Sequence, residues 1–509
     1  MNSLNASSQP ARRQVVQRFS PGGPLGFHFF SPRRFFVLAH DRHHHTIQAV
    51  IEPRRAVRLR GDGRTIGGGE GRRDRVRLLS RQHPSSLGHH DLSQLLATHL
   101  DLSGASQVLG GLVEVDAIPV QPADHFADGV ADNRTLPTHW SPSENILWSV
   151  KLPGWGTSSP VVYGNRVFVT SERNEEGKKS LLTLCFDRAE GTELWRHDFG
   201  LGVKQRVHEK SNLAVNTPAV TADAVYVAFG NADIARYSHD GKLQWVSRYI
   251  PRFGDPKMAW GYCLSPLVLE DSILFPWDHH TGPCFLIGLN PQTGEIAWQN
   301  ERPIGTAHAT PLLVDHHGRK EILVPGKHRL TAFDAKTHAE LWTYGEDEGP
   351  YNGEIIVSPV FADGVVFTQL WRQSRIHAIR LSPDGKPPEP LWVSDRPGGV
   401  EPSLLYYRGL LYVLMDNGVL VCLDGKTGRE HYRQRLGGDC NSSPVASDGR
   451  IYLSNNDGQT LVVKAGTEVE LLATNELGER ITASPAISGN ELIYRTDSKL
   501  YCIGSPAGR

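Results

Sequence analysis

Short apolar runs of three to six residues, separated by polar turns, recur along the chain from Pro160 to its end. In the first copy, an apolar run follows Pro160, Gly164-Asn165 supplies a turn, and further runs cover 167–171, 181–186 and 193–196. A repeat of 40–50 residues with four short strands is typical of a β-propeller blade. Eight prolines at spacings of 41 to 58 residues start the copies: Pro160, Pro218, Pro266, Pro311, Pro359, Pro402, Pro444 and Pro485.

A flat aromatic side chain recurs in the fourth strand of most copies. It follows a polar turn such as Asn290-Pro291-Gln292-Thr293-Gly294, and in one copy His431-Tyr432 takes its place. A large ring at one repeated position buries much area against a neighbouring sheet. We therefore predict packing between adjacent blades for Trp148, Trp195, Trp245, Trp298, Trp342 and Trp392.

The last copy has no fourth strand of its own, because the chain ends soon after 500–503. A matching strand stands before the first copy, at 145–150, and includes Trp148. Pairing this strand with the last copy would close the ring and remove an open sheet edge. The predicted fold class is all-β: an eight-bladed β-propeller closed by an N-terminal strand.

The first 125 residues have a different composition. No Lys occurs before Lys151, and residues 1–81 hold 16 Arg against five Asp and Glu, a net charge of +11. Three interpretations remain open: a basic arm, a disordered tail rich in Gly, Pro, Ser and Arg, or a segment translated from a wrong start or shifted frame, which we favour. The predicted domains are 1–125, of low order, and the propeller at 126–509.

Charge and hydropathy indicate which classes of partner to expect. The whole chain carries −1, so residues 82–509 carry −12 once the +11 of residues 1–81 is removed. A mildly acidic ring gives no reason to expect nucleic acid. No apolar run reaches the roughly 18 residues of a membrane span. No export signal is visible, and this carries little weight if the start is misplaced.

The repeats resemble those of the pyrroloquinoline-quinone-type propellers, with their Asp-x-x-Thr-Gly-Glu-x-x-Trp ending, over about residues 128–504. Known carriers are the quinoprotein alcohol dehydrogenases and the propeller lipoprotein of outer-membrane barrel assembly (BamB). Segments such as 136–141, 158–161, 416–418 and 473–480 are similar to a large set of bacterial propellers, often from planctomycetes. The resemblance implies a periplasmic or cell-envelope location.

The same resemblance defines what an enzyme would need. Quinoprotein dehydrogenases hold the quinone with calcium and use an Asp base, and many place a disulfide between adjacent cysteines beside the cofactor. No two of the six cysteines here are adjacent; Cys185, Cys422 and Cys502 share one slot, and Cys263 with Cys284 is the pair that could meet. His pairs at 279–280 and 316–317 point to opposite faces of a strand. We assign no catalytic residue, no metal site and no cofactor; pyrroloquinoline quinone with calcium is the alternative.

Candidate ligand-binding residues come from the repeat geometry. Side chains just before each innermost strand should surround the mouth of the central channel, where aromatic, imidazole, carboxylate and guanidinium groups suit a polar small molecule or a peptide. The alternative is that they plug the axis and satisfy one another. The set is Trp155, Asn216, Trp260, Tyr262, His308, Glu354, Glu401, Asn441 and Arg480.

These observations favour a non-catalytic propeller that binds a protein or a small polar ligand at its funnel, as a binding or assembly scaffold. Two alternatives stay open. One is a quinone-dependent oxidoreductase, and the other is a propeller sensor domain related to proteins associated with serine/threonine kinases.

Overall fold

The computed structural model describes residues 129–505, except 133, 177, 201–206, 209–210, 259, 280–281, 303–306, 346–354, 371–373 and 400, together with five strands nearer the N-terminus. The chain divides into two compact units, 1–118 and 119–509. In the first unit the five strands form one antiparallel sheet in chain order. They are β1 (Gly26–Phe29), β2 (Phe35–His40), β3 (Thr46–Glu52), β4 (Ala56–Gly61) and β5 (Arg77–Leu78).

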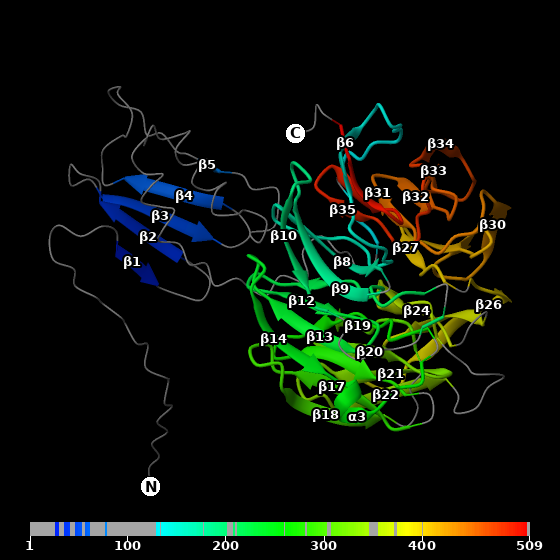
Figure 1. The fold of residues 1–509 in the computed structure, drawn as a ribbon, viewed down its shortest axis with the longest axis horizontal. Helices are drawn as coiled ribbons and strands as arrows, with labels where there is room; N and C mark the ends of the chain where they lie inside the picture. Colours follow the sequence, from blue (N-terminus) through cyan, green and yellow to red (C-terminus); the bar gives the residue numbers. More distant parts are fainter. Residues whose placement is uncertain are drawn as a thin grey trace, which may run out of the picture. The chain divides into compact units, whose positions relative to one another are not determined.

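The second unit consists of eight antiparallel sheets of four strands, the blades of a propeller (Figure 1). Blade one has β7 (Val161–Tyr163), β8 (Arg166–Glu175), β9 (Lys178–Asp187) and β10 (Glu193–Asp198). Blade two has β11 (Ala219–Val220), β12 (Val225–Ala228), β13 (Asp233–Tyr237) and β14 (Leu243–Arg248), followed by the short helix α3 (Ile250–Phe253). Blade three has β15 (Leu267–Val268), β16 (Ile273–Trp277), β17 (Cys284–Leu289) and β18 (Ile296–Arg302).

The next four blades repeat this order. Blade four has β19 (Leu312–His316), β20 (Arg319–Pro325), β21 (Arg329–Asp334) and β22 (Glu340–Gly345). Blade five has β23 (Val360–Ala362), β24 (Val365–Gln369), β25 (Arg375–Arg380) and β26 (Glu389–Pro397). Blade six has β27 (Leu405–Tyr407), β28 (Leu410–Leu414), β29 (Val419–Asp424) and β30 (Glu430–Arg435). Blade seven has β31 (Val445–Ser447), β32 (Arg450–Ser454), β33 (Gln459–Lys464) and β34 (Leu471–Glu476).

The eighth blade confirms the predicted closure. Its first three strands are β35 (Ala486–Ser488), β36 (Glu491–Arg495) and β37 (Lys499–Ile503), and its fourth is β6 (Ile146–Lys151) from the other end of the unit. Trp148 stands opposite Cys502 in this antiparallel pair. In Figure 1 the red strands of the last blade lie beside cyan β6. The eight-bladed ring is therefore closed by hydrogen bonds between its two ends.

In blades one, three, four and six, the polar turn before the fourth strand forms because an Asp or Asn side chain replaces backbone hydrogen-bond partners. The Asp424 carboxylate accepts the backbone N–H groups of Lys426 and Thr427 at 3.1 and 2.8 Å. Asp187, Asn290 and Asp334 do the same in their blades. The turn then ends on a residue with positive φ, such as Gly428 at 72°. This explains the spacing between the Asp and the Gly in the repeat.

The fourth-strand tryptophan lies on that glycine in the next blade. A β-carbon at Gly294 would come within 2.4 Å of Trp245, so the ring needs a bare backbone beneath it. The Trp245 indole N–H donates to the Pro291 carbonyl of the same turn at 2.9 Å. The same arrangement joins Trp148 to Gly191, Trp195 to Gly241 and Trp392 to Gly428. Cys185, Cys422 and Cys502 share one slot, opposite the fourth-strand aromatic.

Two tryptophans of the predicted set differ. The turn of blade four has His338 in the glycine position, with φ at 59°, and Trp298 stacks on its imidazole at 3.9 Å and 13°. Trp342 donates its indole N–H to the Glu321 carboxylate of its own blade at 2.9 Å. Both side chains still lie in the space between two blades, which we call a seam.

Candidate functional site

A ring of hydroxyl groups surrounds the axis at the start of the innermost strands. In each link, the backbone N–H of a Ser or Thr donates to the hydroxyl oxygen of the equivalent residue in the next blade. Among the described residues the links run from Ser159 to Thr217 (3.1 Å), Thr217 to Ser265 (3.0 Å), Ser265 to Thr310 (3.2 Å), Ser358 to Ser403 (3.3 Å), Ser403 to Ser443 (2.9 Å) and Ser443 to Ser484 (2.9 Å).

This ring explains the small residue before most of the repeat prolines, because its hydroxyl accepts a backbone N–H from the preceding blade. It also corrects one repeat. In blade six the ring residue is Ser403, after Pro402, so Leu404 stands where other blades have the proline. The proline spacing alone placed this blade's register incorrectly.

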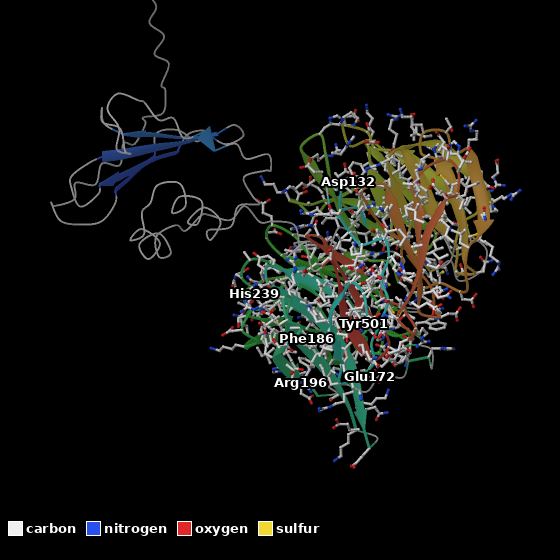
Figure 2. The ribbon with its side chains drawn as sticks, turned by 90° about the horizontal axis from the view of Figure 1, so that it is seen from above. Asp132, Glu172, Phe186, Arg196, His239 and Tyr501 are labelled. Carbon is white, nitrogen blue, oxygen red and sulfur yellow. The ribbon has the colours of Figure 1, made fainter. Side chains whose placement is uncertain are left out.

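One end of the ring carries the connections from each fourth strand to the next blade, and we call it the funnel face. Since the strands are antiparallel, the turns between second and third strands lie there too. Glu172 lies toward this face, on the side of the long β8–β9 hairpin, and Asp132 lies toward the opposite one (Figure 2). The eight candidate ligand-binding residues that the structure describes fall in funnel-face connections.

Two of them, Trp155 and Arg480, meet. The Arg480 guanidinium lies over the Trp155 ring at 5.7 Å, and its Nε donates to Asp497 at 3.0 Å. The Trp155 backbone pairs with Glu172, whose carboxylate accepts the Lys179 ammonium at 2.5 Å. These charges are balanced within blades eight and one. The arrangement holds the connection between those blades in one conformation.

Asn216 and Tyr262 are fully buried. The Asn216 amide donates to the Tyr262 and Leu264 carbonyls at 2.8 and 2.6 Å, which ties blade two to blade three. The Tyr262 ring stacks on Trp277, and its hydroxyl accepts the Asp278 backbone N–H at 3.1 Å. Their contacts are internal, so their side chains act in the packing of this seam.

His308 lies near a buried ion pair at the seam between blades three and four. The Asp278 carboxylate accepts the Arg302 guanidinium at 2.8 Å and the Ala307 N–H at 3.1 Å. Burial raises the pKa of Asp278, and Arg302 and the nearby His308 oppose that shift. Arg302 also donates to the Pro325 carbonyl at 2.8 Å. The pair is fully desolvated, and removing either partner would leave an uncompensated charge.

Trp260 differs from the others because it combines exposure with an aromatic partner. Its side chain is 39% exposed and stacks on His208 at 4.1 Å and 29°. The Ser211 hydroxyl donates to the Trp260 carbonyl at 2.9 Å, which joins the connections that precede and follow blade two. Cys263, three residues later, is a free, half-buried thiol.

The remaining candidates do not join these groups. Glu401 is exposed and Asn441 is half-buried, in the connections before blades six and seven. Glu354 lies outside the described residues. The structure therefore brings together Trp155 with Arg480 and Asn216 with Tyr262. The two pairs lie at different seams of the ring.

One funnel-face residue was missed by the sequence analysis. Arg495, at the end of β36, is fully buried and donates to the Ser158 hydroxyl at 2.6 Å, the Thr170 carbonyl at 2.6 Å and the Ser171 hydroxyl at 3.0 Å. Burial lowers its pKa to about 9, so it is charged at neutral pH. It clamps blade eight to blade one, and a β-carbon at Gly156 would collide with it.

The carboxylates of the funnel face bear on the alternative in which the propeller holds calcium and pyrroloquinoline quinone. Calcium takes about six to eight oxygen ligands. Within the described ranges no three His, Cys, Asp or Glu residues are placed to hold a metal. The Asp278, Asp497 and Glu172 carboxylates each already face a cationic side chain. These three carboxylates are therefore engaged within the fold.

The cysteines and adjacent histidines considered in the sequence analysis have the following contacts. Cys263 and Cys284 are free thiols, and Cys284 accepts the His279 N–H at 3.3 Å. His316 is buried against the Leu381 carbonyl at 3.2 Å, and its ring lies 4.3 Å from that of His317. No helix in the described part of the chain is long and apolar enough to cross a bilayer.

Two known proteins are similar to this chain in sequence. The chain is 21% identical over 400 residues to the outer membrane protein assembly factor BamB of Yersinia pestis, covering 78% of this chain and 84% of the relative. It is 27% identical over 196 residues to the tetrathionate hydrolase of Acidithiobacillus ferrooxidans, covering 34% of this chain and 37% of that protein. The match thus spans little more than a third of that enzyme.

Solved structures agree on the fold. BamB from Moraxella catarrhalis superposes with a TM-score of 0.52 at 13% identity, covering 72% of this chain and 98% of that one. A europium-containing methanol dehydrogenase superposes with a TM-score of 0.55 at 12% identity, covering 74% and 96%. A family model described as outer membrane protein assembly factor BamB matches residues 130–252, 280–386 and 368–508. The chain therefore belongs to the BamB family of pyrroloquinoline-quinone-like repeat propellers.

Proposed function

We propose that this propeller is a non-catalytic scaffold that binds a protein partner on its funnel face, with the Trp260–His208 stack at the centre of the contact. The observation that carries the proposal is the exposed Trp260, which stacks on His208. Charged groups on the same face, such as Arg480 and Glu172, are engaged within the fold. Partly exposed Trp residues in rigid surroundings are the side chains that dominate protein interfaces. The family's role in outer-membrane assembly supports a partner and a location in the cell envelope.

The rigidity of the face also supports this function. Arg480 is held by Asp497 and Trp155, and Glu172 by Lys179 and the Leu213 N–H at 2.8 Å. A surface that is ordered before binding loses little conformational entropy when the partner arrives. The ring therefore offers a preformed platform.

The test is binding of the purified chain to solubilised envelope proteins of its native host, followed by titration of each captured protein. Trp260→Ala should weaken the specific partner by about tenfold or more without lowering the melting temperature. Leu194→Ala provides the matched control, because Leu194 is 46% exposed on the outer edge of blade one. Equal binding by both variants would refute a contact centred on Trp260.

The second candidate is a quinone-dependent oxidoreductase, because the methanol dehydrogenase neighbour has the same ring. Titration with pyrroloquinoline quinone and calcium, followed by absorbance, tests it directly. The scaffold proposal expects no saturable shift and no dye-linked oxidation of alcohols or sugars. A calcium-dependent shift that Glu401→Gln abolishes would establish the oxidoreductase instead.

A further inference from the structure

The seam between blades five and six contains a pocket, and the chain beside it departs from the repeat. Four residues after the fourth-strand aromatic, other blades place a side chain in the seam. These are Leu152, Phe199, Tyr249, Arg302, Leu436 and Leu477, which are buried or half-buried. In blade five this position is Arg396, which is exposed.

A bulge in β26 causes the difference. Val393 pairs with His377 and Pro397 pairs with Arg375, so four residues of β26 span two residues of β25. The two extra residues leave the ladder. The Ser394 hydroxyl closes the gap, because it accepts the Ile376 N–H at 2.9 Å and donates to the Arg396 carbonyl at 2.7 Å.

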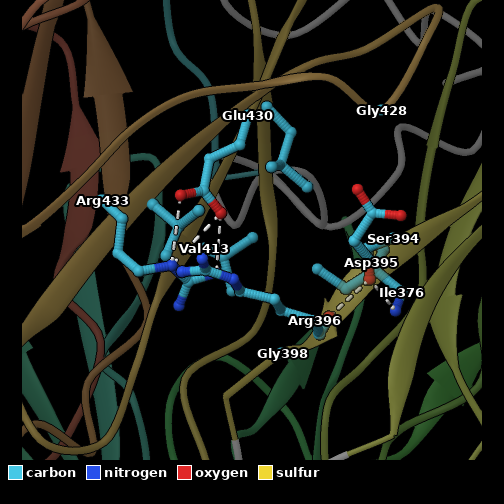
Figure 3. A pocket seen from close by; sticks show the side chains of 11 residues that line it. Ile376, Ser394, Asp395, Arg396, Gly398, Val413, Gly428, Glu430 and Arg433 are labelled. Atoms are coloured by element: carbon cyan, nitrogen blue, oxygen red, sulfur yellow. Dashed lines mark hydrogen bonds and ion pairs between the residues drawn. The ribbon is translucent and has the colours of Figure 1, made fainter.

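The bulge opens a pocket of about 170 Å³ with an aliphatic floor and a charged rim (Figure 3). Ile376, Val413, Val421 and Leu423 form the floor, and each is at most 4% exposed. The rim contains Asp395, Arg396, Glu430 and Arg433. The floor suits a small apolar group and the rim suits an ionic one.

The rim has one uncommitted cation. Arg433 donates to the Glu430 carboxylate at 2.9 Å and contacts the Met415 sulfur at 3.3 Å. The Arg396 guanidinium has no hydrogen-bond or ion-pair partner within the described part of the chain. In Figure 3 the Arg396 side chain runs toward Arg433, whereas the Asp395 carboxylate points away from it. A carboxylate beside the Arg396 guanidinium would therefore meet a positive charge that no rim carboxylate pairs, whereas Arg433 is already paired with Glu430.

We propose that this pocket binds an aliphatic carboxylate with a branched body of about six carbons. A cavity of about 150 Å³ holds a benzene molecule, so the 170 Å³ found here accommodates a leucine-sized group on the four aliphatic side chains. Arg396 receives the carboxylate, since a planar guanidinium matches its two oxygens. This chemistry belongs both to free branched-chain acids and to the C-terminal residue of a peptide. The site is separate from the funnel-face contact and does not depend on it.

The experiment is calorimetric titration of the full chain with 4-methylpentanoate, with 4-methylpentanamide as the uncharged control. We expect saturable one-to-one binding of the acid only. Arg396→Gln should weaken it by about tenfold or more, since it removes a charge-assisted hydrogen bond. Arg435→Gln, on the same β30 strand as Arg433 but outside the pocket, should bind as the unmodified chain does.

Two further arms identify the natural source. An acetylated pentapeptide ending in Leu is compared with the same peptide as its C-terminal amide. If 4-methylpentanoate binds and neither peptide does, the natural ligand is a small branched-chain acid. If the peptide with a free C-terminal carboxylate also binds, the natural ligand is the C-terminus of a peptide or protein. Failure of the acid to bind, equal binding of acid and amide, or no loss in Arg396→Gln would each overturn the proposal.

Discussion

A tryptophan fills the seam between blades two and three, and another fills the seam between blades seven and eight. The two tryptophans come from different parts of the chain. In the first seam, Trp245 from β14 lies on Gly294 in the turn of the next blade. In the second seam, Ala473 occupies the tryptophan position of β34, opposite Val462. Trp140, from the segment before the ring, is 1% exposed there and contacts Tyr452 and Tyr494.

In both seams a large aromatic side chain fills the space, although it comes from a different position in the chain. Trp140 is fixed by its backbone, since its N–H donates to the Asn475 side chain at 2.9 Å. The Asn475 amide in turn donates to the Thr138 carbonyl at 3.0 Å. The segment from Val130 to Trp140 thus acts as a strap across blades seven and eight, in addition to the closure by β6.

Removal of both devices should have the largest effect. A chain starting at residue 152 lacks β6 and Trp140, so β37 has an open edge and the seam between blades seven and eight is empty. We expect loss of cooperative thermal unfolding and aggregation through the exposed edge. A chain starting at residue 119, which lacks the first compact unit, should melt within a few degrees of the full chain. Equal melting of both truncated chains would contradict closure by β6.

Trp140→Ala separates the strap from the closing strand. The side chain is fully buried, so its removal should cost about 3–5 kcal/mol in the free energy of unfolding, measured by denaturant titration. Trp260→Ala is the control, because Trp260 is 39% exposed. If the seam needs only an aromatic ring, adding Ala473→Trp to Trp140→Ala should recover part of the loss. No recovery would mean that stability depends on the strap's own backbone contacts as well as on an aromatic ring in the seam.

Two glycines test whether the tryptophan needs a bare backbone beneath it. Gly294 and Gly478 have φ values of 71° and 74°, so an alanine meets similar backbone strain at both. A β-carbon at Gly294 would lie 2.4 Å from Trp245, whereas one at Gly478 would have no atom within 4 Å. Gly294→Ala should therefore be less stable than Gly478→Ala by about 1–3 kcal/mol, the usual cost of overpacking. Equal unfolding free energies would show that Trp245 moves aside freely.

The sequence predicted the parts of the ring that repeat. The blades, their turns and the closing strand follow from alternating apolar runs and from the Asp-to-Gly spacing of turns such as that at Asp424. The role of Trp140 could not be derived this way, because the residue lies outside the repeat and its partners are more than 300 positions away. The register of blade six was also missed. The sequence pattern indicates Pro402 as the repeat proline, but Leu404 occupies that position in this blade.

The functional residues were harder to predict for a physical reason. Position before the innermost strand indicated the funnel face, but it did not tell which side chains turn inward. The Asn216 amide donates to two carbonyls next to blade three, whereas Trp260 remains exposed. The pocket at Arg396 depends on two extra residues in β26, which appear only when the strand register is known.

The smallest expected effect concerns a carboxylate buried at the seam between blades one and two. Asp233 is fully buried, and burial raises its pKa to about 6, although Arg248 and Asn231 oppose the shift. Arg248 also covers Phe199 of blade one at 5.6 Å, so the ion pair belongs to the seam. Because the folded state binds this proton more tightly than the unfolded state, stability falls as pH rises from about 4 to about 6 and stays lower above that.

Asp233→Asn removes this titration while keeping an oxygen that can accept the Asn231 amide. The variant should therefore gain about 1–2 kcal/mol over the unmodified chain at pH 7.5, because Arg248 is half-exposed and water can replace its lost partner. At pH 4 the two chains should have equal unfolding free energies, since the carboxyl is then protonated in the folded state. Glu301→Gln, which changes an exposed side chain of β18, should show no such pH-dependent difference. A loss of stability at pH 7.5 would mean that the Arg248 ion pair outweighs the burial of the charge, and this seam would then depend on electrostatics as well as on Trp195.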